Sequence, residues 1–186
     1  MEKEKKFSCC VFEEEYSKNC IAQSLKECNE NKLLPIFVCV GSDLVLGDSL
    51  GPLVGTLLKN KGINNYIYGT LATPITAKEV NYLNEYLNGV HKNTVFISVD
   101  AAVGNENDVG LIKICNKGLK PGLGVNKNLK TVGDISIIGV VAEKSINNRS
   151  LFYMTRLNLI YKMARIIAEG VEKYLTENFN NNKYYA

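Results

Sequence analysis

The sequence predicts a three-layer α/β/α fold built on one mostly parallel β-sheet. Short apolar runs rich in β-branched residues alternate along the chain with longer stretches in which apolar residues recur at helical spacing. The connections between them are short, and this alternation is typical of a parallel sheet that helices cover on both faces. The length of 186 residues is enough for one domain with a sizeable core and too short for two ordinary ones.

The N-terminal 34 residues are expected to form a helical appendage to this domain. Apolar side chains recur at approximately helical spacing over residues 12–31, and an Asn-rich stretch ends the pattern. We place a single α/β domain over residues 35–178 and a loose polar C-terminal tail over residues 179–186. The side chains expected on the inner side of the N-terminal helix are Tyr16, Cys20, Ile21 and Leu25.

The domain is predicted to begin with a buried strand and a helix. Residues 36–40 are apolar, and a helix follows over residues 52–61. Pro52 suits the first turn of that helix, because its missing N–H would have no partner there in any case. The inner face of the helix is expected to carry Leu53, Val54, Leu57 and Leu58.

A second strand, a second helix and a third strand are predicted next. The strand lies over residues 66–69, and the helix lies over residues 75–90. Thr76 and Glu79 stand at the spacing of a capping box, which supports a helix start at Thr76. The third strand, over residues 93–100, is apolar enough to be buried on both faces.

Two further strands and a long helix complete the predicted domain. The strands lie over residues 109–115 and 134–141, and the hairpin-like spacing before the first of them indicates that one later strand runs antiparallel. The helix lies over residues 150–175. Its expected apolar stripe is formed by Met154, Leu157, Ile160, Tyr161, Ala164, Ile167 and Val171.

The composition is that of a globular protein of the cell interior. Hydrophobic residues make up 46% of the chain and charged residues 22%, and the net charge is +3. The lysines are scattered, so neither nucleic acid nor a membrane surface is expected as a partner. No apolar run approaches the length of a membrane span. The N-terminus is charged where a secretory signal would be apolar, which favours a cytoplasmic location.

The six cysteines do not have the spacing of a metal site. Four of them lie within the first 28 residues, but no CxxC pair is present, and the single histidine, His91, lies far away in the sequence. Reduced thiols are therefore favoured over a zinc site. We expect neither a metal nor another cofactor.

Aspartates stand where two predicted strands end. Asp43 and Asp48 follow the first strand, and Asp100 closes the third. If these strands are neighbours, the carboxylates converge at the carboxyl edge of the sheet, which is the working edge of an open α/β fold. Two close carboxylates cannot both ionise easily, so the pKa of one rises and the pair can divide acid and base roles toward an attacking water.

A purely structural interpretation of the same residues stays open. Asp48 could cap the following helix or act as a partner of its dipole, Asp43 could make an Asx turn, and Asp100 could cap the turn after its strand. A nucleotide site is not expected, because the glycine-containing loop over residues 41–51 has neither GxGxxG nor the lysine of a P-loop.

Five ordered blocks of sequence carry a family resemblance. They read FVCVGSDLVLGDSLGPLVGTLL, YGTLATPITA, ISVDAAVG, LKPGLGVNKNLKTVGDISIIGVV and TRLNLIYKMA. Together, over residues 37–164, they resemble sporulation proteins of the YyaC type. Those proteins are similar to the spore germination protease and share the fold of the hydrogenase maturation proteases. The resemblance implies a phosphorylase/hydrolase-like fold, and the N-terminal appendage lies outside it.

The resemblance also implies which residues work. The germination protease family is classed with the aspartic peptidases, and its two assigned aspartates fall on Asp48 in GDSLGP and Asp100 in SVDAA. Asp43, Ser49 and Lys127 are expected as supporting groups, since a lysine near two carboxylates lowers their pKa or binds a developing oxyanion. The loops expected to hold substrate carry Gly41, Pro121, Gly122 and Gly124.

Two departures weaken the comparison with the metal-dependent maturation proteases. Asp48 and Ser49 stand where those enzymes carry an Asp-Glu pair, and His91 precedes the third strand instead of following it. The long insertions and the propeptide of the germination protease are also missing. Substrate recognition and self-processing therefore do not carry over.

The function expected from these observations is peptide hydrolysis during spore formation or germination. Asp48 and Asp100 would activate water against a protein or peptide substrate, such as the small basic spore proteins, in the cytoplasm of the spore or sporulating cell. The alternative is a catalytically inactive sporulation factor that binds a protein through the same crevice or through a dimer face, and a homo-oligomer is compatible with either.

Overall fold

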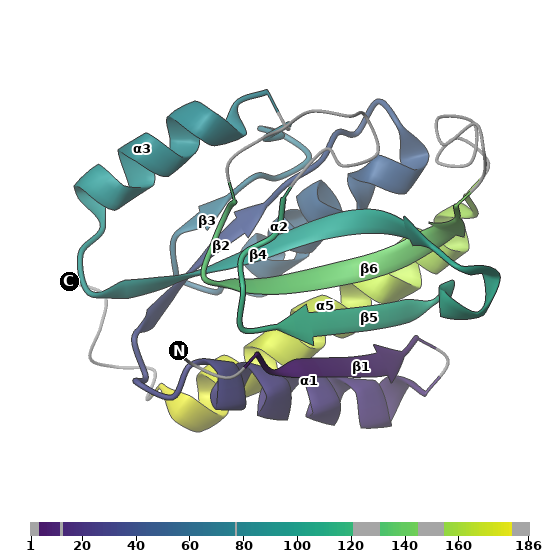
Figure 1. The fold of residues 1–186 in the computed structure, drawn as a ribbon, viewed down its shortest axis with the longest axis horizontal. Coiled ribbons are helices and arrows are strands. Elements are labelled where there is room, and N and C mark those ends of the chain that lie inside the picture. Colours follow the sequence, from purple (N-terminus) through teal and green to yellow (C-terminus); the bar gives the residue numbers. More distant parts are fainter. Residues whose placement is uncertain (1–3, 12, 77, 121–130, 145–154, 180–186) are drawn as a thin grey trace.

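Six strands form one mixed sheet in the order β1-β5-β6-β4-β2-β3 (Figure 1). The computed structural model describes residues 4–11, 13–76, 78–120, 131–144 and 155–179. Four neighbouring strands, β6, β4, β2 and β3, run parallel, and β5 runs antiparallel to both β6 and β1, so the predicted mostly parallel sheet with one reversed later strand is confirmed. The strands are β1 (Lys6–Cys10), β2 (Leu34–Cys39), β3 (Ile67–Tyr68), β4 (Thr94–Gly104), β5 (Leu111–Cys115) and β6 (Ile135–Glu143).

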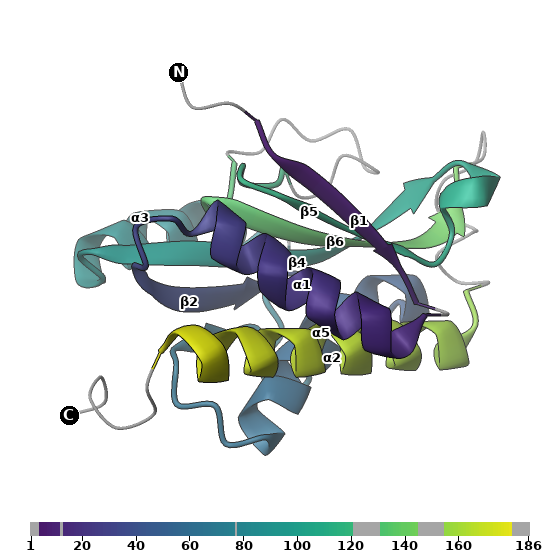
Figure 2. The same cartoon turned by 90° about the horizontal axis from the view of Figure 1, so that it is seen from below.

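Helices cover both faces of the sheet, as the predicted α/β class requires. Helices α1, α2 and α5 pack on one face, where Figure 2 shows them together below the strands, and α3 packs on the other face. The helices are α1 (Glu14–Cys28), α2 (Leu50–Asn60), α3 (Val80–Val90) and α5 (Leu157–Asn178), and two short 3₁₀ turns are η1 (Leu46–Ser49) and η2 (Glu106–Asp108).

Strand β2 shows how helices on both faces of the sheet affect the composition of a strand. Alternate side chains of a strand point to opposite faces. Phe37 and Cys39 enter the cluster beneath α2 and α5, whereas Val38 and Val40 enter the cluster beneath α3. All four are almost completely buried. A strand that helices cover on both faces buries all of its side chains, and this is why β2 is apolar throughout.

The N-terminal segment contributes more than the expected helix. Residues 6–10 form the edge strand β1, which pairs with β5, and this strand was not predicted. Ile21 and Leu25 of α1 are fully buried in the same cluster as α5 and the sheet, as expected, but Tyr16 is 62% exposed and does not lie on the inner face. The first residues of the chain are thus built into the main core.

Helix α1 covers the free edge of β1. The Ser17 hydroxyl donates to the carbonyl oxygen of Cys10 (2.6 Å), and the Cys20 thiol donates to the carbonyl oxygen of Ser8 (3.9 Å). An open sheet edge would offer such carbonyls to another chain. Side chains of the following helix use them instead.

Several element boundaries differ from the prediction. The third predicted strand, β4, continues to Gly104 instead of ending at Asp100, because the small apolar residues after Asp100 keep pairing with β6. Helix α3 begins at Val80 rather than at residue 75. The N–H of Thr76 does donate to the Glu79 carboxylate (2.9 Å), but this contact shapes the turn before the helix.

The apolar stripe of the closing helix is only partly correct. Ile160, Ala164, Ile167 and Val171 are fully buried on the sheet, as predicted. Leu157 and Tyr161 are instead 61% and 49% exposed, because they lie one turn apart on the outer side of the helix, while Ile160 in the same first turn is buried. Met154 and residues 180–186 of the expected tail lie outside the described residues.

Within the part of the chain that the structure describes, no helix combines the length and the apolar composition needed to cross a membrane.

Candidate active site

The candidate site lies at a step in the sheet where β2 stops and β4 continues. The last residue of β2, Cys39, is paired with Val99, so Asp100 is the first residue of β4 beyond its neighbour. At the same place the chain leaves β2 into a loop over residues 41–49. The predicted adjacency of the two strands is therefore confirmed, and it brings the loop and Asp100 to one edge of the sheet (Figure 1).

The loop is folded back tightly on the end of β2. Gly41 has φ +145°, and a Cβ atom there would lie 2.1 Å from the carbonyl oxygen of Asp48. The N–H of Ser42 donates to that same carbonyl (3.0 Å). Only glycine allows the two backbone segments to approach so closely. Gly41 thereby fixes Asp48 beside the end of the strand, and this is its observable role.

Asp48 sits in η1 in a partly buried position. Burial raises the pKa of its carboxyl group to about 6, and the backbone N–H of Ser42 acts in the opposite direction. Removing a carboxylate from water disfavours its charged form. Asp48 nevertheless ionises below neutral pH.

Asp100 is partly buried in β4 and holds its proton more strongly. Burial is the main cause that raises its pKa well above the usual value, and the negative charge of Asp48 is the second. The Ala101 N–H donates to Asp100 Oδ1 (2.8 Å) and lowers the pKa, but less strongly. The pKa of Asp100 is thus raised by the charge of Asp48 in addition to its burial, so the two carboxyl groups titrate as a coupled pair.

The hydrogen bonds around Asp48 and Asp100 are not those of capping residues. The N-cap position of α2 is Ser49, and no side chain caps that helix start. In the loop, the side chain that accepts a hydrogen bond from the N–H of Leu44 is the hydroxyl of Ser42 (3.2 Å) and not an aspartate. Asp100 lies inside β4 and not at its end. Capping therefore does not account for Asp48 or Asp100.

The other predicted site residues have different surroundings. Asp43 belongs to the same loop but is exposed to solvent. Ser49 is buried, and its hydroxyl donates to the carbonyl oxygen of Leu46 (2.7 Å), so it supports the shape of η1. The remaining predicted positions, Lys127, Pro121, Gly122 and Gly124, lie outside the described residues.

His91 lies at the opposite end of the sheet from the aspartates, as its place in the sequence indicated. It follows α3 directly, and its Nε2 is 2.8 Å from the hydroxyl of Tyr68, with the ring of Tyr66 4.6 Å away. Among the residues that the structure describes, no three His, Cys, Asp or Glu side chains are grouped as metal ligands.

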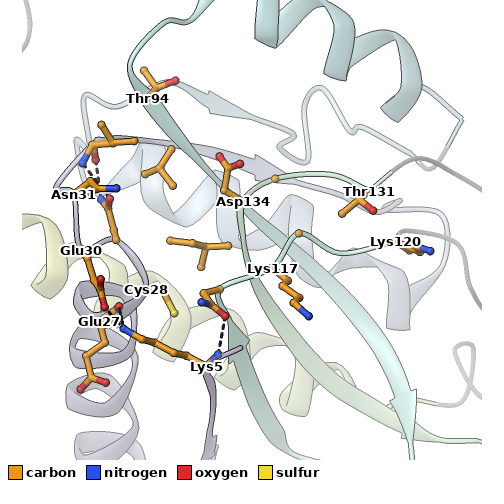
Figure 3. Close-up of a pocket in the computed structure, with 17 residues that line it drawn as sticks. Lys5, Glu27, Cys28, Glu30, Asn31, Thr94, Lys117, Lys120, Thr131 and Asp134 are labelled. Carbon is orange, nitrogen blue, oxygen red and sulfur yellow. Dashed lines mark hydrogen bonds and ion pairs between the residues drawn. The ribbon is translucent and has the colours of Figure 1, made fainter. Parts of the chain in front are cut away.

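Sequence reasoning did not find a groove at that opposite end of the sheet (Figure 3). This groove of about 890 Å³ lies between the end of α1, the start of β4 and the end of β5. Lys5 crosses it, and its backbone N–H donates to Asn116 (2.7 Å) while its ammonium group pairs with Glu30. The Thr94 hydroxyl is buried there without a partner among the described atoms. The lining comes from distant segments, so no local motif signals it.

Comparison with known proteins gives three findings. Residues 11–170 match the profile of a family described as protein of unknown function (DUF1256). The uncharacterized protein YyaC of Bacillus subtilis (strain 168) is 41% identical over 137 residues, which are 73% of this chain and 67% of the relative. The crystal structure of a nickel–iron hydrogenase maturation protease, HycI from Thermococcus kodakarensis KOD1, aligns with a TM-score of 0.45 and 19% identity, and the alignment covers 80% of this chain and 98% of that one. A likeness at this last level says nothing about the chemistry of the present chain.

Proposed function

The chain belongs to the DUF1256 family of proteins of unknown function, and we propose that it hydrolyses peptide bonds with Asp48 and Asp100. One observation carries this proposal. Two carboxyl groups from neighbouring segments meet at the step between β2 and β4, and the charge of one raises the pKa of the other. Such a pair is suited to holding one proton between two groups.

We assign the role of base to Asp48 and the role of acid to Asp100, whose pKa is raised by the charge of Asp48 in addition to burial. Asp48, ionised near neutral pH, accepts a proton from a water molecule placed between the carboxyl groups. The water oxygen attacks the carbonyl carbon of the substrate. Asp100, still protonated, donates its proton to the carbonyl oxygen, so that no oxyanion is left uncompensated. The proton taken up by Asp48 then passes to the leaving amine as the C–N bond breaks. Asp100 takes back a proton from a hydroxyl of the collapsing diol, so that a carboxylic acid leaves and both side chains return to their starting states.

The biological setting is proposed from the resemblance of GDSLGP and SVDAA to the motifs of the spore germination protease. We place the activity in spore formation or germination, in the cytoplasm of the spore or sporulating cell. The substrates would be proteins or peptides, including small basic spore proteins. Lys127, Pro121, Gly122 and Gly124 stay predictions as supporting and substrate-holding residues, and Asp43 stays a prediction as a supporting group.

A non-catalytic binding role at the same place is the second candidate. Leu44, at the tip of the loop that carries Asp48, is 85% exposed. An exposed apolar side chain on the loop that carries Asp48 offers an apolar contact to another protein. In this role the protein would be an inactive sporulation factor.

The test is cleavage of small basic spore proteins, followed by mass spectrometry, with wild type, Asp48→Asn, Asp100→Asn and the double variant. Each single variant should lose at least about 10²-fold in rate, because each removes one half of the proton transfer. The double variant should be no slower, since groups that act as a unit are not additive.

The matched control is Asp108→Asn, which removes a carboxylate that is paired with Lys113 (3.1 Å) outside the pair. This variant should cleave as wild type does. Full activity of Asp48→Asn or Asp100→Asn would remove that residue from the mechanism. A wild-type protein that binds these substrates and never cleaves them would support the binding role.

A further inference from the structure

Two thiols from different elements meet where α1 crosses β1. Cys9 points from β1 into the core and is 3% exposed, and its Sγ donates to the carbonyl oxygen of Ile112 (3.7 Å). The partly exposed Cys20 of α1 donates from its Sγ to the carbonyl oxygen of Ser8 (3.9 Å). That carbonyl belongs to the peptide group that joins Ser8 to Cys9. The Cys20 sulfur therefore lies against the backbone of Cys9.

The neighbouring thiol changes the acidity of Cys9. Burial is the main cause that raises the pKa of the Cys9 thiol to about 12, and the Cys20 thiol raises it further through its charge and a hydrogen bond. Cys39 differs from Cys9 in the cause of its raised pKa: its thiol reaches about 12 through burial alone, with no contribution from another thiol. The effect on Cys9 agrees with the contacts in placing the two thiols side by side.

The other cysteines do not share this arrangement. Cys10 follows Cys9 on β1, and successive side chains of a strand point to opposite faces, so Cys10 points away from α1. Within the described ranges, no third His, Cys, Asp or Glu joins Cys9 and Cys20 as a metal-ligand group. The site consists of two thiols that face each other across the contact between a strand and a helix.

We propose that Cys9 and Cys20 form a reversible disulfide when the protein meets a hydroperoxide. A disulfide requires Cα atoms within about 7 Å and Cβ atoms that point toward each other. Cys9 points toward α1, and the Cys20 sulfur already touches the peptide group of Cys9. Closing the bridge therefore requires that the Cys20 side chain rotate from the Ser8 carbonyl oxygen toward the Cys9 sulfur. This inference is independent of the aspartate chemistry.

The partly exposed thiol is the one that meets the oxidant first. The Cys20 thiolate attacks one peroxide oxygen, the O–O bond breaks, and Cys20 becomes a sulfenic acid while a water molecule leaves (an alcohol, if the hydroperoxide is organic). The Cys9 sulfur then attacks the Cys20 sulfur, the S–O bond breaks, and the departing hydroxide takes the Cys9 proton as water. Two thiols lose two electrons in total, and the peroxide gains them.

The bridge would tie the edge strand covalently to the helix that covers it. In the reduced protein, Cys20 and Ser17 satisfy the outward carbonyls of β1 by hydrogen bonds alone. In the oxidised protein, Ser8 loses its S–H donor, but β1 can no longer separate from α1. Oxidising conditions would therefore secure the N-terminal segment.

The test uses the full-length protein, reduced and then treated with a small excess of hydrogen peroxide. Remaining thiols are alkylated with N-ethylmaleimide in guanidinium chloride, and tryptic peptides are mapped by mass spectrometry. Peptide 7–18 should be found joined to peptide 19–26 with the loss of two hydrogens, and dithiothreitol should separate them. The protein should lose two of its six alkylatable thiols. In a separate digestion of the native protein, tryptic cleavage after Lys18 should be at least about fivefold slower after oxidation than before it.

Three variants decide the assignment. Cys20→Ser, at a partly exposed position, should reduce the joined peptides to less than about one tenth, and Cys9→Ser should do the same. Cys10→Ser is the matched control on the same peptide, and its crosslink should equal that of wild type. A crosslink that disappears in Cys10→Ser, one that forms only between two molecules, or none in wild type would overturn the proposal.

Discussion

Asp48 and Asp100 are chemically the same side chain, but different combinations of causes raise their pKa values. Burial raises the pKa of both, but only Asp100 is raised by the charge of its neighbour as well. In such a coupled pair, the loss of the first proton makes the second harder to remove. At the scale of single residues, this order is what separates a proton acceptor from a proton donor.

A raised pKa has a cost in stability that Asp48→Asn should relieve. Above the unfolded pKa of about 4, the folded state still holds a proton that the unfolded state has released, so stability falls as the pH rises to about 6 and stays reduced above it. After discounting for partial exposure, the substitution should raise the free energy of unfolding at pH 7 by about 1–2 kcal/mol. At pH 3 the two proteins should be nearly equal, because both states are then protonated. Urea denaturation across this range measures the difference.

The control for this experiment is again Asp108→Asn. Its carboxylate is ion-paired and partly exposed, so the change should stay within about 0.5 kcal/mol at both pH values. If Asp48→Asn lowers stability at pH 7, its carboxylate supports the fold in the charged state, and the coupled pair loses its physical basis.

At the scale of elements, two helical glycines have opposite surroundings. A Cβ atom at Gly51, in the first turn of α2, would lie 2.0 Å from the carbonyl oxygen of Val40. At Gly89, near the end of α3, a Cβ atom would meet nothing within 4 Å. Gly51→Ala should therefore cost about 3 kcal/mol or more, because two backbone segments must separate. Gly89→Ala should stabilise the protein by about 0.5 kcal/mol through helix propensity.

Thermal and denaturant unfolding of the two glycine variants, compared with wild type, give these values. A Gly51→Ala protein as stable as wild type would mean that α2 does not begin against the end of β2. The loop that presents Asp48 would then have a different shape.

The elements that the sequence predicted well are those with a strong pattern of their own. The strand at β2 and the helix at α2 were found because apolar residues dominate one and recur at helical spacing in the other. The edge strand β1 was missed because its sequence, KFSCC, is short and polar at its exposed positions, and only its pairing with β5 makes it a strand. The length of β4 was missed for a similar reason, since its last residues are held by β6.

The part of the candidate site that could be predicted from the sequence is the part that follows from the order of the strands. Placing Asp48 near Asp100 needed just the rule that neighbouring parallel strands end at one edge, and the pairing of β2 with β4 supplies that condition. The groove around Lys5 could not be found in the same way. Its lining comes from the start of β1, the end of α1, the start of β4, the end of β5 and the start of β6. These segments are far apart in the sequence, so no short-range pattern indicates that they meet.

At the scale of the whole molecule, the N-terminal segment should be needed for folding. Removing residues 1–30 deletes β1 and α1 and uncovers the surface that Ile21 and Leu25 bury completely. We expect a loss of about 5 kcal/mol or more, which approaches the entire stability of an ordinary domain. The bared edge of β5 should also promote self-association. Circular dichroism and sedimentation velocity of the truncated chain measure both effects.

A truncated protein that stays monomeric and unfolds cooperatively near the wild-type midpoint would contradict this expectation. It would show that the α/β domain is complete after residue 30 and that the first elements are accessory to it. The exposed Tyr16 provides a milder comparison, because Tyr16→Ala in the full chain should change stability by no more than about 0.5 kcal/mol.

The place of β1 in the sheet has a consequence for synthesis on the ribosome. The N–H of Lys5 bonds to Asn116, 111 residues further along the chain, and α1 packs against α5, the C-terminal helix among the described residues. The segment that forms β1 and α1 is therefore synthesised well before its partners. Until β5 and α5 emerge, its apolar side chains must wait without a surface to cover them. Contacts of such long range also slow folding, since the chain must close a large loop before any of them is gained. This part of the protein is thus expected to complete its fold only once α5 is available, with β1 and α1 docking as a late step.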